Sequence, residues 1–412
     1  MGLKVIIACE SIFSLPLAKM LEQFDIEYIL LEPHSTIAPQ FGASIGLLPN
    51  GLRILDQLVC YEKIKEAAGD VSYRTILCLF SGNTWTDTQP VSFSQLGYPQ
   101  IFVDRKTLQQ VLFDKFKFKD RVLTTQVVVS VDLLGEQATF HTQDASVHTV
   151  HTGDIVFGAD GVHSAIRGEM HYFAVSDFHL GLQSESECIF GVSKRPTGLP
   201  GTAIQVNSFF KSCNYMVLSA PNNSLYWFLF TSFARLYGKA IPEFTKEYKL
   251  ALAENHFDEQ VTETFRDIHA NRLQTTLVAL AGHVFPRSYF QGVLIIGKAA
   301  HKFLFTEVQA KRFIRAEAAE TFFFSRVLVD YFFTRLSQSL IWGLIIKNME
   351  TGPTIDDIPI PKRCEKAVIR HRETTNKRSW SFWSLVTLGP GILTLLQYST
   401  ISWIRTSCTS RD

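Results

Sequence analysis

KVIIACESIFSL, residues 4–15, decides the fold, because an apolar strand here runs through a short turn into a helix. The helix pattern continues to Phe24, and a second apolar strand at 28–31 leads directly into Glu32. This order is that of a βαβ unit, and an acid roughly 20 residues after the turn is placed to hold a ribose hydroxyl. The pattern predicts an α/β fold with a Rossmann-like dinucleotide-binding unit.

The turn of this unit lacks the glycines that such units normally carry. Glycine makes the tight bend and lets the backbone approach a diphosphate closely. Cys9, Ser11 and Ser14 stand in those places, and Glu10 adds a negative charge where a diphosphate would lie. The sequence therefore predicts a dinucleotide frame with an altered phosphate-binding turn.

Composition limits the classes of function. With 412 residues the chain is long enough for two or three domains, and a formal charge of +1 gives no reason to expect nucleic acid as a partner. The seven cysteines are scattered and form no C-x-x-C pair, which argues against a disulfide framework or a zinc site. We find no metal-ligand spacing and no secretory signal, so the protein is not expected to be secreted.

The C-terminal region is strongly apolar. Residues 379–404 contain no charged side chain, and several lysines and arginines precede them between 362 and 378. A span of this length predicts membrane association with the catalytic body on the cytosolic side, either as a single pass or peripherally. Gly389-Pro390-Gly391 interrupts the segment, so two apolar helices that cover the body are an alternative.

Four further motifs follow in order along the chain. A small-residue loop contains Gly46, and a strand that ends at Asp104 is followed by Arg105. A buried strand enters the turn GADGVHS at 158–164, and another apolar strand leads into GKAAHK at 297–302.

Together these motifs resemble the aromatic-hydroxylase class of FAD-dependent monooxygenases, most closely the fungal epoxidases of meroterpenoid and indole-diterpene biosynthesis. The resemblance covers roughly residues 3–350. It implies a Rossmann-like FAD-binding domain, an inserted substrate domain with a mixed β-sheet, and a C-terminal apolar helical tail. The implied boundaries are 1–75, 100–172 and 275–348 for the FAD-binding domain, 76–99 and 173–274 for the substrate domain, 349–378 for a linker, and 379–412 for the tail.

The resemblance also implies roles for individual residues. Tyr226 is the first candidate for a catalytic tyrosine and Tyr215 the second, although an aromatic strand that merely faces the core is the alternative. The family's ribityl aspartate is replaced by Lys298, and its flavin-loop glycines by Val308 and Ala310. The residues implied to bind the cofactor are Glu32, Gly46, Arg105, Asp160, Lys298, Ala310 and Lys311.

The function implied is that of a monooxygenase with FAD as cofactor and NAD(P)H as reductant. It would epoxidise or hydroxylate a prenylated, lipophilic small molecule in fungal terpenoid or meroterpenoid biosynthesis. The altered motifs keep a second hypothesis open, in which the chain has lost FAD and acts as a cyclase, an isomerase or an inactive scaffold.

Overall fold

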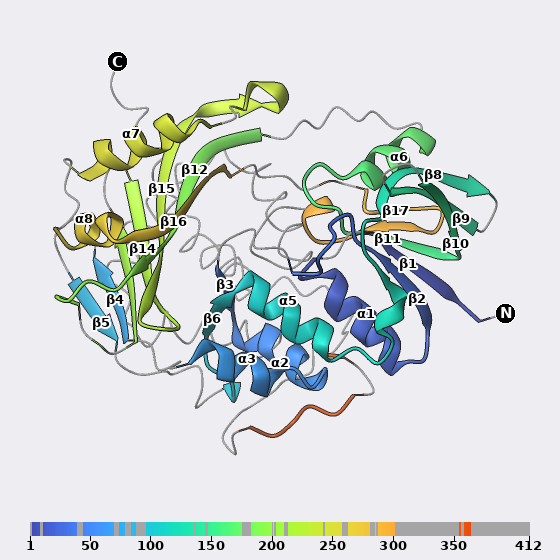
Figure 1. Cartoon of the computed structure of the whole chain (residues 1–412), viewed down its shortest axis with the longest axis horizontal. Helices are drawn as coiled ribbons and strands as arrows, with labels where there is room; N and C mark the ends of the chain where they lie inside the picture. Colours follow the sequence, from blue (N-terminus) through green and yellow to red (C-terminus); the bar gives the residue numbers. More distant parts are fainter. Residues whose placement is uncertain are drawn as a thin grey trace, which may run out of the picture.

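The structure is a computed structural model, and it describes residues 2–300, 354–355 and 358–363, apart from short gaps. Two sheets with their helices lie side by side, and a two-stranded sheet of β3 (Ser44–Leu47) and β6 (Ile101–Asp104) lies between them with helix α5 (Arg105–Asp114) (Figure 1). The gaps within 2–300 are 9–10, 39–43, 70–73, 79–83, 88–95, 135–136, 145–146, 175–182, 200, 202, 210–212, 242–243, 258–262, 281–284 and 286.

A six-stranded sheet in the order β17-β18-β11-β1-β2-β7 forms the first half. Its central strands are parallel and come from distant parts of the chain, since β1 lies between β2 and β11 and β11 pairs with β18. Near-continuous apolar runs such as KVIIA are typical of strands covered on both faces. The strands are β1 (Lys4–Ala8), β2 (Glu27–Leu31), β7 (Val122–Leu123), β11 (Ile155–Gly158), β17 (Tyr289–Phe290) and β18 (Val293–Ile295).

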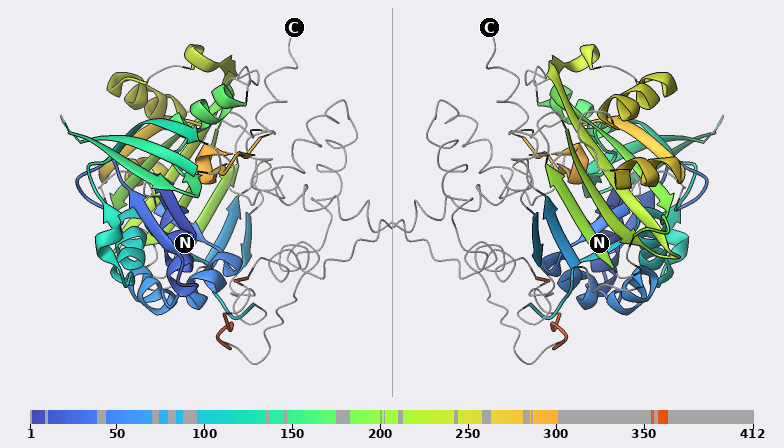
Figure 2. Two further views of the ribbon diagram at one scale, coloured as in Figure 1. Left: turned by 90° about the vertical axis from the view of Figure 1, so that its right-hand side faces the viewer. Right: turned by 90° about the vertical axis from the view of Figure 1, so that its left-hand side faces the viewer.

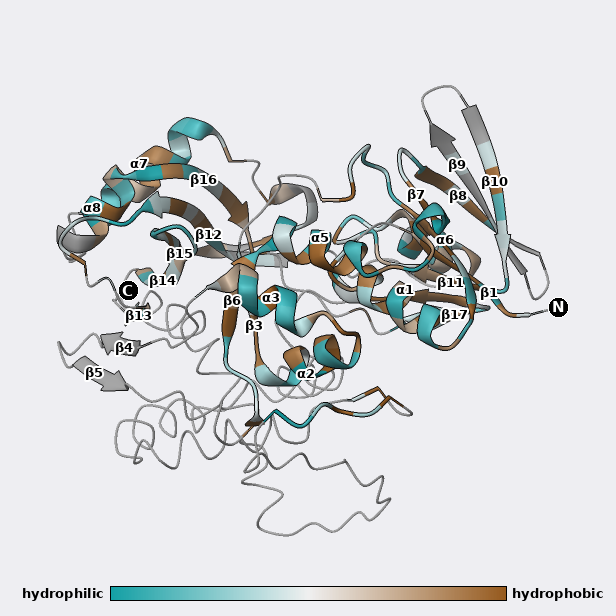
Figure 3. Ribbon diagram, turned by 60° about the horizontal axis from the view of Figure 1, so that its bottom comes forward, coloured by the Kyte–Doolittle hydropathy of each residue, from teal (hydrophilic) through white to brown (hydrophobic). Residues whose placement is uncertain are grey.

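Each face of this sheet buries a separate core. Val5 and Ile7 of β1 pack with helices α1 and α5, whereas Ile6 and Ala8 point to the other face and pack with α6. These central strands carry hydrophobic colour in Figure 3. The helices are α1 (Ser14–Gln23), α2 (Pro49–Gln57), α3 (Tyr61–Ala68), α5 (Arg105–Asp114), α6 (Ala165–Phe173) and η1 (Lys119–Arg121), and an antiparallel sheet of β8 (Val127–Leu134), β9 (Gln137–Asp144) and β10 (Val147–Gly153) lies next to α6.

A seven-stranded sheet in the order β16-β12-β15-β14-β13-β4-β5 forms the second half. Helices α7 and α8 lie over one face, which the right-hand view of Figure 2 shows from their side. The bounds are β4 (Arg74–Cys78), β5 (Thr84–Asp87), β12 (Gln183–Lys194), β13 (Ile204–Phe209), β14 (Cys213–Ala220), β15 (Ser224–Tyr237), η2 (Gly238–Ala240), α7 (Lys246–Phe257), α8 (Glu263–Ala270) and β16 (Arg272–Ala279).

A two-stranded antiparallel sheet, formed by strands far apart in the sequence, connects the two halves. Strands β3 (Ser44–Leu47) and β6 (Ile101–Asp104) are antiparallel, with Gly46 opposite Phe102. A Cβ on Gly46 would lie 2.8 Å from the Phe102 ring, so a glycine is needed here for packing. The Phe102 ring in turn packs with Phe190 and Tyr226 of the seven-stranded sheet. The β3–β6 sheet therefore brings the predicted cofactor residue Gly46 next to the predicted substrate sheet.

Two short described stretches, 354–355 and 358–363, dock on α2 and α3. Gln57 donates to the carbonyl oxygens of Ile355 (2.9 Å) and Ile358 (2.6 Å) and accepts from the Ile355 amide at 3.0 Å. Arg363 donates to both carboxylate oxygens of Asp56, at 2.7 and 2.6 Å, and Asp56 is buried. Part of the predicted linker 349–378 is thus packed against the first half.

We expect Arg363→Ala to lower the free energy of unfolding by about 2 kcal/mol, because it leaves the buried Asp56 carboxylate without its cation. The loss should be smaller than for a fully buried pair, since the Arg363 side chain is 27% exposed. The midpoint of urea unfolding measures it. Lys362→Ala, which removes an exposed neighbouring charge, is the control, and equal midpoints for the two variants would contradict the docking role.

The prediction of a membrane location is wrong for the described part of the chain. None of the helices there has the length and apolar character needed to cross a bilayer. The apolar segment 379–404, on which that prediction depended, lies outside the described residues, as does the whole predicted tail 379–412.

Candidate functional site

The carboxyl ends of four parallel strands meet at one edge of the six-stranded sheet. Ala8 pairs with Leu31 on one side and with Gly158 on the other, and Gly158 pairs with Ile295. The residues that follow these strand ends therefore share the edge where ligands bind in open α/β sheets. They include Ser11, Glu32, Asp160 and Lys298, three of which are predicted cofactor residues.

Glu32 is buried at this edge and already has partners. Its Oε1 accepts from the His34 amide at 2.9 Å and lies 2.5 Å from His34 Nδ1. Glu32 is 2% exposed, whereas the His34 side chain is half exposed. A ribose hydroxyl at Glu32 would share the carboxylate with His34. The sequence analysis did not find His34, although its position two residues after the acid was the available signal.

Ser11 closes the start of helix α1. Its Oγ accepts from the Phe13 and Ser14 amides at 3.1 Å each, and its carbonyl oxygen accepts from Leu15 N at 3.1 Å. Ser14 Oγ in turn accepts from the Ser11 amide. In a dinucleotide-binding unit such amides are the donors that receive a diphosphate. Here a serine hydroxyl occupies two of them.

The GADGVHS turn places Asp160 between β11 and α6. Asp160 Oδ2 accepts from the Ile166 amide at 3.2 Å, while Oδ1 is buried with no hydrogen-bond partner among the described residues. A buried, unsatisfied carboxylate oxygen is unfavourable, and a donor from a bound molecule would satisfy it. Gly161 has φ +83°, a conformation that favours glycine, and Ser164 Oγ caps α6 by accepting from the Arg167 amide at 2.9 Å.

Arg167 joins this turn to the next one, and the sequence analysis missed it. Its Nη1 donates to the Ala299 carbonyl at 2.8 Å and its Nη2 to the Val162 carbonyl at 2.7 Å. The guanidinium lies 4.1 Å from the centre of the Phe285 ring. Burial lowers the pKa of Arg167, and the charge of Asp160 opposes this shift. Arg167 therefore fixes the position of the turn that carries Lys298.

Lys298 stands on that turn, η3 (Gly297–Ala299), directly after β18. Gly297 has φ +58°, and a Cβ there would lie 2.6 Å from the Phe13 ring, so the turn contacts the start of α1. Part of the Lys298 side chain is exposed, yet desolvation by the surrounding protein lowers its pKa, and the positive charge of Arg105 lowers it further. Arg105, another predicted cofactor residue, thus contributes to the electrostatic environment of Lys298 although it lies 193 positions earlier in the sequence.

These residues fit a dinucleotide such as FAD at several points. The unsatisfied Asp160 oxygen suits a hydroxyl donor, and the Lys298 ammonium suits an anion. The start of α1 departs from the usual arrangement, because Ser11 occupies its amides. Ala310 and Lys311, the remaining predicted cofactor residues, lie outside the described part of the chain.

The two predicted catalytic tyrosines lie on opposite faces of the seven-stranded sheet. Tyr226 is 2% exposed and packs with Phe102 and Phe190 on the face toward the β3–β6 sheet. Tyr215 lies on the other face and stacks on Phe265 of α8, with ring centres 4.8 Å apart. Only Tyr226 faces the half that carries the cofactor residues.

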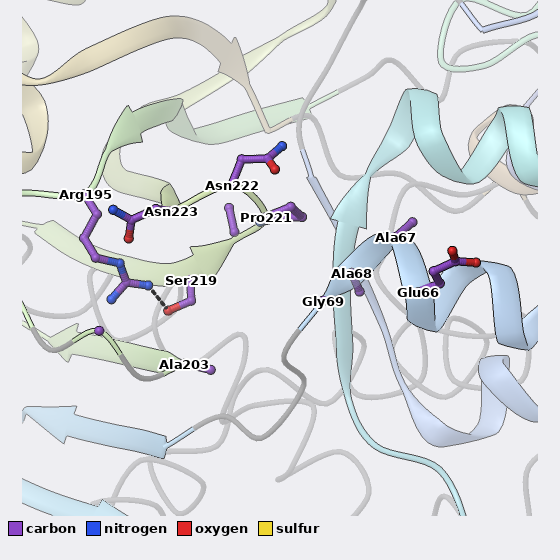
Figure 4. A pocket seen from close by; sticks show the side chains of 12 residues that line it. Glu66, Ala67, Ala68, Gly69, Arg195, Ala203, Ser219, Pro221, Asn222 and Asn223 are labelled. Carbon is purple, nitrogen blue, oxygen red and sulfur yellow. Dashed lines mark hydrogen bonds between the residues drawn. The ribbon is translucent and has the colours of Figure 1, made fainter.

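A polar pocket of about 500 Å³ lies elsewhere, between the end of α3 and the β14–β15 turn. Arg195 and Ser219 are on one wall, where Arg195 Nη2 donates to Ser219 Oγ at 2.6 Å, and Glu66 and Gly69 are on the other (Figure 4). None of the predicted site residues lines this pocket. We therefore place the functional site at the sheet edge.

Known proteins are similar in sequence to this chain over most of its length. The chain is 34% identical to the FAD-dependent monooxygenase penM of Penicillium crustosum over 305 residues, which are 72% of this chain and 64% of penM. It is 32% identical to the FAD-dependent monooxygenase ptmM of Penicillium ochrochloron over 313 residues, 72% of each chain. The chain thus spans less than two thirds of the length of penM. No family model matches the chain.

Solved structures share the fold. The complex of Klebsiella pneumoniae HpxO with FAD and uric acid gives a TM-score of 0.61 at 19% identity, over 73% of this chain and 74% of HpxO. This likeness confirms the predicted α/β architecture. The sequence likeness to ptmM, above 30% identity over more than two thirds of both chains, shows that this chain belongs to the family of FAD-dependent monooxygenases.

Proposed function

We propose that the chain is a FAD-dependent monooxygenase that epoxidises or hydroxylates a prenylated, lipophilic small molecule, with NAD(P)H as reductant. The observation that carries this proposal is the strand edge that gathers Glu32, Asp160 and Lys298 in a chain of this family. The apolar layer around Tyr226 and Phe102 supports a lipophilic substrate.

Glu32, Asp160, Arg105 and Lys298 would hold FAD, with Glu32 toward the ribose. When bound and reduced, FAD supplies the activation of dioxygen for transfer of one oxygen atom. The chain's own contribution is to bind, orient and exclude water. Phe102 and the aromatic residues of the facing sheet provide an apolar wall that suits this task, and Tyr226 is the proposed catalytic residue in that wall.

Ser11 supports the second hypothesis, in which the chain has no FAD and performs a redox-neutral step or none. The hydroxyl occupies two amides that would otherwise receive the diphosphate, so FAD binding loses these donors. The two hypotheses differ in one property that is simple to measure, which is the uptake of flavin.

The visible absorbance spectrum of the protein, recorded after incubation with FAD and gel filtration, tests the proposal. We expect retained flavin bands, and then NAD(P)H-dependent oxygenation of a prenylated substrate. A colourless protein that takes up no FAD would overturn the monooxygenase proposal in favour of the redox-neutral one.

Tyr226→Phe should lower the rate of oxygenation by about 10²-fold, the lower end for a positioned proton-transferring group, while the flavin content stays unchanged. Removing one hydroxyl preserves the ring that packs with Phe102 and Phe190. Tyr215→Phe, on the opposite face, is the matched control and should change the rate little. Equal rates for Tyr226→Phe and the unchanged protein would exclude Tyr226 as a catalytic residue.

A further inference from the structure

Two observations place the turn that carries Lys298 beside the start of helix α1. The turn that carries Lys298 is held by the hydrogen bond from Arg167 Nη1 to the Ala299 carbonyl at 2.8 Å and by the bond from Ala300 N to the Gly297 carbonyl at 3.1 Å. The Phe13 ring contacts the same turn at Gly297. Lys298 therefore lies next to the place where the helix amides of a dinucleotide-binding unit receive a diphosphate.

In this chain, two backbone amides at the start of α1 already donate hydrogen bonds to a side chain. Ser11 Oγ accepts from Phe13 N and Ser14 N, so a ligand would have to displace a hydroxyl before it could reach either donor. A diphosphate at this edge needs other positive groups to offset its charge. Lys298 is the cation that the turn at Gly297–Ala299 brings to this place, since Gly297 contacts Phe13.

We infer that Lys298 holds the diphosphate of the dinucleotide in place of the α1 amides. The inference rests on the proposed FAD-dependent function and assigns the charge-binding part of its site. A lysine suits this role because it meets a phosphate as a point charge and does not require bidentate geometry.

Titration of flavin fluorescence tests the inference through affinity alone. Lys298→Gln should raise the Kd for FAD about tenfold, the loss typical of one charge-assisted hydrogen bond, and should flatten its dependence on salt. The Kd for riboflavin, which has no phosphate, should not change. Lys106→Gln removes an exposed charge next to Arg105 on α5 and is the matched control, with an expected Kd equal to that of the unchanged protein.

Ser11→Gly is expected to change the affinity for FAD in the direction opposite to Lys298→Gln. Without the hydroxyl the Phe13 and Ser14 amides become available, so FAD should bind several-fold more tightly, and the change should restore part of the affinity lost in Lys298→Gln. Thermal unfolding of each variant checks that the fold is retained. If Lys298→Gln binds FAD as tightly as the unchanged protein, the inference is wrong while the proposed function stands.

Binding of ADP distinguishes a failure of this inference from a failure of the proposed function. A protein that takes up no FAD would contradict the proposed function, and isothermal titration with ADP would then still decide the role of Lys298. Weaker ADP binding by Lys298→Gln supports the inference. Equal ADP affinity, or no ADP binding to the unchanged protein, overturns it.

Discussion

Gly191→Ala is expected to disrupt the seven-stranded sheet, with a loss of more than about 3 kcal/mol in the free energy of unfolding. Gly191 of β12 lies opposite Trp227 of β15, and a Cβ at residue 191 would lie 2.0 Å from two indole carbons. The Trp227 indole has no space to move, because it is fully buried and donates Nε1 to Ser193 Oγ at 2.8 Å. The added methyl group must therefore push apart two paired strands.

Urea unfolding, or the yield of folded protein where the variant does not fold, measures the effect. Gly168→Ala is the control, because Gly168 lies within α6 with nothing within 4 Å of the new Cβ, and alanine is favoured in helices by about 1 kcal/mol. Trp227→Leu removes the conflicting ring atoms, so the double variant Gly191→Ala/Trp227→Leu should lose less than the sum of the single losses. A strictly additive result would contradict the steric explanation.

The second large effect is expected at Glu22, a buried carboxylate on α1. It accepts from Lys19 Nζ at 2.9 Å, from the Tyr28 hydroxyl at 2.8 Å, and from the amides of Lys117 and Phe118 at 3.0 to 3.1 Å. Lys19 is itself buried, at 4% exposure. Glu22→Gln leaves this ammonium without its anion, and breaking a buried pair in this way costs about 3–5 kcal/mol.

The free energy of unfolding that Glu22→Gln loses should depend on pH, and it should be smaller at acidic pH. Burial alone would raise the pKa of Glu22, but the Lys117 and Phe118 amides and the Lys19 ammonium outweigh it and lower the pKa below 4.5. Because the folded pKa is the lower one, the stabilisation is present above pH 4.5 and is lost as the pH falls through the folded value. The difference between Glu22→Gln and the unchanged protein should therefore be largest near neutral pH and narrow below pH 4.5.

The midpoints of urea unfolding of Glu22→Gln and of the unchanged protein, measured at neutral pH and at two acidic pH values, test both the size of the destabilisation and the direction of its pH dependence. Glu66→Gln is the matched control, because Glu66 pairs with Lys63 on the surface at 3.0 Å, with both side chains more than half exposed. Such pairs contribute less than about 1 kcal/mol. If the difference in free energy of unfolding between Glu22→Gln and the unchanged protein stays constant with pH, the Glu22 carboxylate is not the stabilising group.

The backbone frame of the site was predictable from the sequence because apolar runs determine it. The strands before Ser11, Glu32, Asp160 and Lys298 are all short, apolar and followed by turn residues. The observed parallel pairing of β1, β2, β11 and β18 confirms the strand-turn pattern read from them.

The contacts that define the site were not predictable in the same way. The missing glycines showed that the first turn was altered, but the closure by Ser11 depends on hydroxyl geometry that composition does not reveal. The opposite faces of Tyr215 and Tyr226 follow from strand register, where a shift of one residue exchanges the faces. Arg363 looked like one charge of a polar linker because its partner, Asp56, is 307 positions earlier.

That separation has a consequence for how the chain acquires its structure during synthesis. The first sheet needs β1, β11 and β18, so it cannot be complete before residue 295 has been made, and α2 gains its contact with Arg363 only after residue 363 has been made. No shorter N-terminal portion can complete this core. Early segments with apolar faces therefore remain exposed until β18 has been made, which takes about 15 to 60 seconds at 5–20 residues per second. We expect the first half to assemble only after β18 has left the ribosome.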